Sequence, residues 1–319
     1  MKKKVVVVVG ATASGKTALG VDICKAFNGE VISADSMQIY KSLCISTAKP
    51  TPDEMQGIPH HLIDFLDVTE KYSVSDYCRD ARAALEDIIS RGKTPVIVGG
   101  TGLYIDSFIS NTRFMEDAVS DDIREALKKE SEEFGMDKLY SELQEVDPEA
   151  AKTIHPNNKV RVLRALEVYR TTGKTISEQV ALSHTEESDI EPLFIGIGYS
   201  DREKLYDRIN RRVDLMLQAG LLEEAKSFFF QNPSKTSFNA IGCKELKPFI
   251  DGHCSLDICI DNLKKETRHY AKRQITWFKR NKNINWFYAD LVERETMLND
   301  IFSLINDFLG GDKCEEKKA

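Results

Sequence analysis

The sequence lacks the long apolar runs and paired cysteines that mark membrane or disulfide-stabilised proteins. Its seven cysteines are an odd number without a C-x-x-C pair, so neither a disulfide framework nor a zinc site is predicted. We therefore expect a reducing, cytoplasmic location. No segment approaches the roughly 20 apolar residues that cross a bilayer, so no membrane association is expected.

A net positive charge is also absent, because 51 acidic residues outnumber 44 basic ones and give a net charge of −7 over 319 residues. This balance excludes a surface that is basic throughout, but it allows a local basic groove. The N-terminal lysines before Val5 to Val9 imitate a signal peptide, yet the apolar run is too short and stops at Gly10. A buried parallel strand is the better interpretation of these valines.

A complete G-x-x-x-x-G-K-T phosphate loop follows that strand, from Gly10 to Thr17. Its glycines, Gly10 and Gly15, let successive backbone N–H groups turn toward phosphate oxygens at the start of a helix. Lys16 would neutralise phosphate charge, and Thr17 would ligate Mg²⁺. The sequence therefore predicts a polyphosphate site with magnesium as its cofactor.

Short apolar runs alternate with helical patterns along the first hundred residues, which is typical of β-α-β units and a parallel sheet. The expected strands are residues 5–9, 31–34, 95–98 and 194–198. The predicted fold is α/β, a P-loop parallel sheet flanked by helices with a small helical insertion domain. The segment 47–72 is too long for a simple connector, so we expect a functional loop or lid there.

The insertion is predicted from the composition of residues 116–149, which contain thirteen acidic residues and only four basic ones. Apolar residues recur there at helical spacing: Ile123, Leu127, Phe134, Leu139, Leu143 and Val146. We expect residues 113–190 to form the insertion, and residues 1–112 and 191–319 to form the catalytic core. The tail after Gly311 is expected to be frayed.

Two strand ends supply further candidates, because ligands of open parallel sheets bind beyond the carboxyl ends of the strands. Asp35 follows the second strand, where it could serve as a general base or simply cap a turn. The third strand ends in Gly99-Gly100-Thr101 and lacks the Walker-B carboxylate. This absence disfavours a motor or switch ATPase but allows a small-molecule kinase.

Basic residues gather on two predicted helices in the C-terminal third. Arg208 and Arg212 lie one turn apart on a helix from residue 203 to 217, where they could bind a leaving pyrophosphate or face solvent. The segment 262–282 interleaves lysines and arginines with aromatic rings such as Trp277. This pattern allows RNA binding, with the rings either stacking on bases or packing in the core.

Together these motifs strongly resemble the tRNA dimethylallyltransferases, across about residues 5 to 285. The motifs that carry the resemblance are the phosphate loop, Asp35–Tyr40, Thr47–Pro50, Ile58–Asp64, Gly99–Tyr104, Arg164–Val168 and Ala271–Phe278. The resemblance implies transfer of a dimethylallyl group from dimethylallyl diphosphate to N6 of adenosine 37, beside the tRNA anticodon. The phosphate loop would then bind a diphosphate rather than hydrolyse ATP.

The resemblance also implies a role for each candidate residue. Catalysis would rest on Asp35 as the base and on Lys16, Thr17, Thr101 and Arg212 around the departing pyrophosphate. Diphosphate would be bound by Gly10, Ala11, Thr12, Ala13, Ser14, Gly15, Lys16, Thr17 and Arg208, and the metal by Thr17. The anticodon stem-loop would be bound by Asp35, Ser36, Met37, Gln38, Thr101, Val160, Arg161, Arg164, Ala240, Lys244, Lys272, Arg273, Trp277 and Arg280.

The chain departs from the family pattern at Val160, where glutamine is usual, and at Cys243, where an aromatic residue is usual. Both departures bear on which tRNAs are preferred. His60 and His61 match a family motif, and we expect them to have a structural role. The alternatives are an adenylate isopentenyltransferase acting on AMP, a P-loop small-molecule kinase and an RNA-binding module without activity. We expect a monomer.

Overall fold

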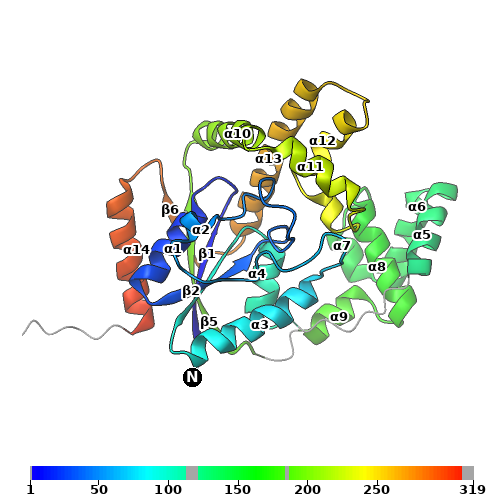
Figure 1. Ribbon diagram of the computed structural model, residues 1–319. Helices are drawn as coiled ribbons and strands as arrows, with labels where there is room; N and C mark the ends of the chain where they lie inside the picture. Colours follow the sequence, from blue (N-terminus) through cyan, green and yellow to red (C-terminus); the bar gives the residue numbers. More distant parts are fainter. Residues whose placement is uncertain (1, 113–120, 184–186, 311–319) are drawn as a thin grey trace, which may run out of the picture. The chain divides into compact units, whose positions relative to one another are not determined.

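The computed structural model describes residues 2–112, 121–183 and 187–310 (Figure 1). Contacts divide the chain into a first unit of residues 1–109 and 189–319 and a second unit of residues 110–188. The expected fraying after Gly311 and the first residues of the acidic insertion lie outside the described residues. The division of roles between a catalytic core and an insertion domain stays a prediction.

The first unit is built on one six-stranded sheet in which all neighbouring strands are parallel, in the order β3-β2-β4-β1-β5-β6. Its strands are β1 (Lys3–Gly10), β2 (Gly29–Ala34), β3 (His60–His61), β4 (Thr94–Gly99), β5 (Ile190–Gly198) and β6 (Ile284–Tyr288). Strand β1 lies between β4 and β5, and all five of its valines are fully buried. The α/β prediction is confirmed, and burial on both faces of the sheet explains the valine run.

Helices cover both faces of this sheet (Figure 1). The α-helices of the first unit are α1 (Lys16–Ala26), α2 (Pro52–Met55), α3 (Val74–Ser90), α4 (Gly102–Ile109), α10 (Arg202–Gln218), α11 (Leu221–Phe230), α12 (Cys243–Ile250), α13 (Leu256–Phe278) and α14 (Arg294–Leu309). One apolar cluster packs Val6 and Val8 against Ile23 of α1 and Ile301 of α14. The opposite face packs the alternate valines of β1 against α3 and α4.

Two strands of the sheet do not appear among the predicted ones. Strand β6 forms the edge beside β5, and β3 forms the other edge within the long segment 47–72. In β3, the Nε2 atom of His61 lies 2.7 Å from a carboxylate oxygen of Glu30. This hydrogen bond and the strand pairing give the histidine motif a place in the scaffold.

The second unit has its own helices and core. Its described helices are α5 (Asp121–Glu133), α6 (Met136–Val146), α7 (Pro148–Thr153), α8 (Lys159–Thr172) and α9 (Ile176–Ser183). Leu127, Leu139 and Leu143 are buried, as their spacing predicts. Phe134 lies outside this core, because it follows the end of α5, is 50% exposed and packs against the Lys138 ammonium group.

Candidate active site

The phosphate loop joins β1 to α1, and its backbone takes the curled form that its glycines predict. Gly15 caps α1 with a φ of 100°, in the left-handed region that favours glycine. A Cβ atom on Gly10 would lie 2.3 Å from the carbonyl oxygen of Ile197 in β5, so a larger residue does not fit. The loop therefore lies directly against the carboxyl end of the neighbouring strand.

Lys16 is the first residue of α1, and its side chain turns back toward the phosphate loop. Its Nζ atom donates a hydrogen bond to the carbonyl oxygen of Ala11 at 2.7 Å. Burial and the positive charge of Arg212 lower the pKa of Lys16 to about 8, although Asp35 acts in the opposite direction. A bound diphosphate would add negative charge beside this ammonium group and raise its pKa again.

Helix α10 brings both predicted arginines to the loop. The Nε atom of Arg208 donates to the carbonyl oxygen of Ala13 at 3.0 Å, and a guanidinium nitrogen of Arg212 lies 3.5 Å from Thr12 Oγ1. Burial lowers the pKa of Arg212. A purely solvated basic face is thus excluded for Arg212, while Arg208 is exposed but fixed to the loop.

Asp35 lies where β2 ends, and it also organises the turn that follows. Its Oδ1 atom accepts hydrogen bonds from the backbone N–H groups of Met37 at 2.9 Å and Gln38 at 3.3 Å. The carboxylate thus caps a turn and also lines the cavity, while its role as a general base stays a prediction. Thr101 stands beside it, accepting a hydrogen bond from the backbone N–H of Ser36 at 3.1 Å.

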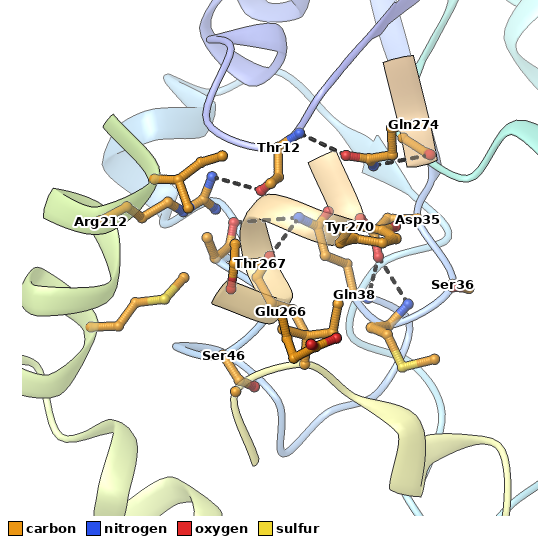
Figure 2. A pocket seen from close by; sticks show the side chains of 18 of the residues that line it. Thr12, Asp35, Ser36, Gln38, Ser46, Arg212, Glu266, Thr267, Tyr270 and Gln274 are labelled. Atoms are coloured by element: carbon orange, nitrogen blue, oxygen red, sulfur yellow. Dashed lines mark hydrogen bonds between the residues drawn. The ribbon is translucent and has the colours of Figure 1, made fainter. Parts of the chain in front are cut away.

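Several of the predicted site residues line one cavity of ≈ 350 Å³ (Figure 2). The predicted site residues that line it are Thr12, Lys16, Thr17, Asp35, Ser36, Met37, Gln38, Arg212, Lys244 and Arg273. Apolar side chains complete part of its wall, from Val98, Ile209, Val213, Met216 and Leu263. The cavity therefore offers cationic groups, an apolar surface and the carboxylates of Asp35, Glu245 and Glu266.

Helix α13 contributes cavity residues that are absent from the predicted site. Tyr270 and Gln274 lie one turn apart; Gln274 reaches Thr12 of the phosphate loop, and Tyr270 lies near Asp35 (Figure 2). Burial and the nearby Asp35 carboxylate raise the pKa of Tyr270, which keeps its phenol protonated. Leu263, Thr267, Tyr270 and Gln274 follow a spacing of three or four residues, and this periodicity is the signal that could have revealed one inward face.

Other predicted tRNA contacts lie away from the cavity. Lys272 is exposed on α13. Trp277 donates from Nε1 to Asp106 at 2.7 Å, and the Arg280 guanidinium lies 4.0 Å from the centroid of its ring. The assignment of Ala240 needs correction, because this residue is 0% exposed within the apolar core and offers no surface to a partner.

Three predicted tRNA contacts belong to helix α8 of the second unit. Val160 is 79% exposed, and Arg161 is exposed beside it. Arg164 forms an ion pair of 3.3 Å with Glu167, a buried carboxylate that Arg124 also binds. The first two side chains are thus accessible, while Arg164 also stabilises the unit itself.

Known proteins share this architecture and sequence. The family model described as IPP transferase matches residues 38–281. The chain belongs to the IPP transferase family. Among its family relatives, the tRNA dimethylallyltransferase of Caldanaerobacter subterraneus is 49% identical over 91% of this chain and 93% of its own length. That of Bacillus subtilis is 46% identical over 95% of this chain and 97% of its own length.

Solved structures of IPP transferases agree with the sequence comparison. The full-length tRNA isopentenylpyrophosphate transferase from Bacillus halodurans has a TM-score of 0.73 and 41% identity, covering 97% of both chains. A eukaryotic dimethylallyltransferase acting on tRNA has a TM-score of 0.82 and 34% identity, covering 96% of this chain and 79% of the other. The fold and the family are therefore established independently of the site residues.

Proposed function

We propose that this chain transfers the dimethylallyl group of dimethylallyl diphosphate to N6 of adenosine 37 in tRNA, giving N6-(dimethylallyl)adenosine and pyrophosphate. One observation carries the proposal: the same cavity is lined by the phosphate loop, by the Asp35 carboxylate and by an apolar wall. A diphosphate, a proton acceptor and a five-carbon chain each find matching chemistry there. The names of the relatives support the same activity.

The diphosphate end would be held by the loop and by α10. Backbone N–H groups at the start of α1, the Lys16 ammonium and the Arg212 guanidinium all favour negative charge there. That charge grows on the pyrophosphate as the allylic carbon–oxygen bond breaks. Stabilisation that strengthens toward the transition state accelerates the reaction rather than only binding the donor.

The residues present suit a magnesium ion bound mainly through the diphosphate. Thr17 lines the cavity, and the described residues contain no cluster of acidic, histidine or cysteine side chains that could hold a metal alone. Such a site suits Mg²⁺, which usually keeps waters and substrate phosphates as ligands. When bound, the ion would supply charge neutralisation on the diphosphate, with Thr17 as its protein ligand.

At the acceptor end, Asp35 would take the proton that the adenine amine loses. The amine nitrogen forms a bond to the allylic carbon, the carbon–oxygen bond breaks, and pyrophosphate leaves with the bonding electrons. Hydrogen bonds from described residues end on Oδ1 of Asp35, and Oδ2 would accept the proton. The apolar wall around Ile209 and Leu263 would enclose the dimethylallyl chain and limit access of water.

The target base must leave the anticodon-loop stack to reach this cavity, at a cost of a few kcal/mol. Lys244 and Arg273 at the cavity, and Lys272 and Arg280 elsewhere on the first unit, would bind the RNA backbone. Arg161 on the second unit would add a further phosphate contact. We also propose that the enzyme acts in the cytoplasm as a monomer. No described helix has the length and hydropathy of a membrane span.

The decisive test supplies purified protein with dimethylallyl diphosphate, Mg²⁺ and unmodified tRNA carrying adenosine at position 37. Mass spectrometry of the nucleosides should show N6-(dimethylallyl)adenosine, together with an equimolar amount of pyrophosphate. Parallel reactions replace the tRNA with AMP, or the donor with labelled ATP. Prenylation of AMP alone would indicate an adenylate isopentenyltransferase, and transfer of the γ-phosphoryl group would indicate a kinase; either result overturns the proposal.

A further inference from the structure

Two cysteine side chains meet at the junction of α12 and α13, outside the site described above. The Sγ atoms of Cys254 and Cys259 lie 3.2 Å apart. Cys254 belongs to the loop between the two helices, and Cys259 lies in the first turn of α13. The six cysteines within the described residues are all free thiols. This junction is where two of them are in direct contact.

The two thiols differ in access. Cys259 is 2% exposed and packs in the apolar core, whereas Cys254 is half-buried. Burial and the hydrogen bond with Cys254 raise the pKa of the Cys259 thiol. A reagent in solution therefore reaches Cys254 first, and the Cys259 thiol is in contact with the sulfur atom that has reacted.

The loop between the helices holds this arrangement in place. The backbone N–H of His253 donates to the carbonyl oxygen of Pro248 at 2.8 Å, and that of Cys259 donates to Ser255 at 3.3 Å. These two backbone hydrogen bonds flank the thiol pair and hold the segment that carries both sulfur atoms. Forming a disulfide bond of about 2.05 Å requires the sulfur atoms to approach by little more than one ångström.

We propose that Cys254 and Cys259 form a dithiol that small-molecule disulfides oxidise reversibly to an intramolecular disulfide. In the first step the Cys254 thiolate attacks glutathione disulfide, which forms a mixed disulfide and releases one glutathione thiolate. Cys259 then attacks the Cys254 sulfur, forming the protein disulfide and releasing the second glutathione. In total the two cysteine thiols are oxidised, and one glutathione disulfide is reduced to two glutathione thiols that carry the two protons.

The test treats the folded full-length chain with glutathione disulfide, blocks the remaining thiols and analyses tryptic peptides by mass spectrometry. Both cysteines fall in one tryptic peptide, because no lysine or arginine lies between them. The internal disulfide should lower the mass of that peptide by two hydrogens, and dithiothreitol should restore it. Stable glutathione on Cys254 in the native chain, or two free thiols after treatment, would overturn the proposal.

Variants separate the two steps. Cys259→Ser should trap glutathione on Cys254, because no second thiol remains to displace it. Cys254→Ser should leave Cys259 unmodified, because that thiol is buried. Cys44→Ser is the matched control: it removes an exposed thiol elsewhere and should leave the internal disulfide unchanged. If Cys259→Ser fails to fold, the native chain still decides the question through the mass of its own peptide.

Discussion

The side-chain oxygen of Gln274 on α13 accepts a hydrogen bond from the backbone N–H of Thr12 in the phosphate loop, at 2.8 Å. The side-chain nitrogen of the same amide donates to the carbonyl oxygen of Gly100 at 3.0 Å. A Cβ atom on Gly100 would lie 2.1 Å from that nitrogen, so the amide fills the space which the missing side chain leaves. Gln274 thus ties α13 to both the phosphate loop and the end of β4.

Replacing Gln274 with alanine should weaken donor binding more than tRNA binding. The loop loses the group that holds Thr12 in place, and a lost buried hydrogen bond of this kind raises KM for dimethylallyl diphosphate by about tenfold. Steady-state kinetics with each substrate varied in turn would measure the effect. Lys265→Ala, an exposed change on the same helix, is the control. An unchanged KM in a folded Gln274→Ala variant would show that the loop keeps its shape unaided.

Asp35→Asn should lower single-turnover prenylation by about 10²- to 10⁴-fold, the range for losing a positioned general base. Asparagine keeps an oxygen that can accept from Met37 and Gln38, so the turn should survive. Binding of tRNA, followed by filter retention, should change little. Normal turnover in Asp35→Asn or Asp35→Ala would disprove the assignment of this carboxylate as the base.

The sequence predicts best those elements whose residue pattern clearly favours one type of structure. Val5 to Val9 fit a buried strand better than a signal peptide because the run is short and stops at Gly10, and the phosphate-loop motif itself specifies the backbone form. Strand β6 was missed because Asn285 interrupts its short apolar run, and β3 because a pair of histidines carries no strand signal. The inward face of α13 was missed for another reason. Its polar residues, such as Thr267, look like solvent-facing ones until a partner surface is known.

Lys272→Gln should weaken tRNA binding without changing KM for dimethylallyl diphosphate. Its side chain is exposed, so a phosphate contact is the role that its charge could serve. The slope of log affinity against log salt concentration should fall by about one unit. Arg273→Gln should weaken the binding of both tRNA and dimethylallyl diphosphate, because Arg273 also lines the cavity. An unchanged salt slope in Lys272→Gln would remove this residue from the RNA interface.

Glu30 allows a test of what stabilises the fold away from the candidate active site. This carboxylate is 2% exposed and is bound by Arg91, Lys93 and His61. Glu30→Gln should lower the free energy of unfolding by about 3 kcal/mol, because it breaks a buried ionic cluster. The control, Asp87→Asn, removes an exposed partner of the same arginine and should leave the denaturation midpoint nearly unchanged. Equal effects of the two changes would contradict a special role for burial.

The pH dependence of stability follows from the same cluster. The hydrogen bond from Arg91 and the contacts with Lys93 and His61 hold the pKa of Glu30 well below its ordinary value of 4.5. Its stabilising contribution is therefore complete above pH 4.5 and is lost as the pH falls through the lower, folded-state pKa. Denaturant titrations from about pH 7 down to about pH 3 should show that the free energy of unfolding falls more steeply in the native chain than in Glu30→Gln.

Donor binding should depend on pH through Lys16, whose pKa is lowered to about 8. Below that pH the ammonium is charged and attracts the diphosphate; above it, the free enzyme loses this charge. Affinity for an unreactive thio-analogue of the donor should therefore fall as the pH rises, approaching about tenfold per unit. Binding near pH 8 should also take up protons, because the bound diphosphate raises the pKa of Lys16 again. Calorimetry in buffers of different ionisation enthalpy measures that uptake. Lys16→Arg keeps its charge across this range and should give a flat profile, whereas a falling profile in Lys16→Arg would assign the titration to another group.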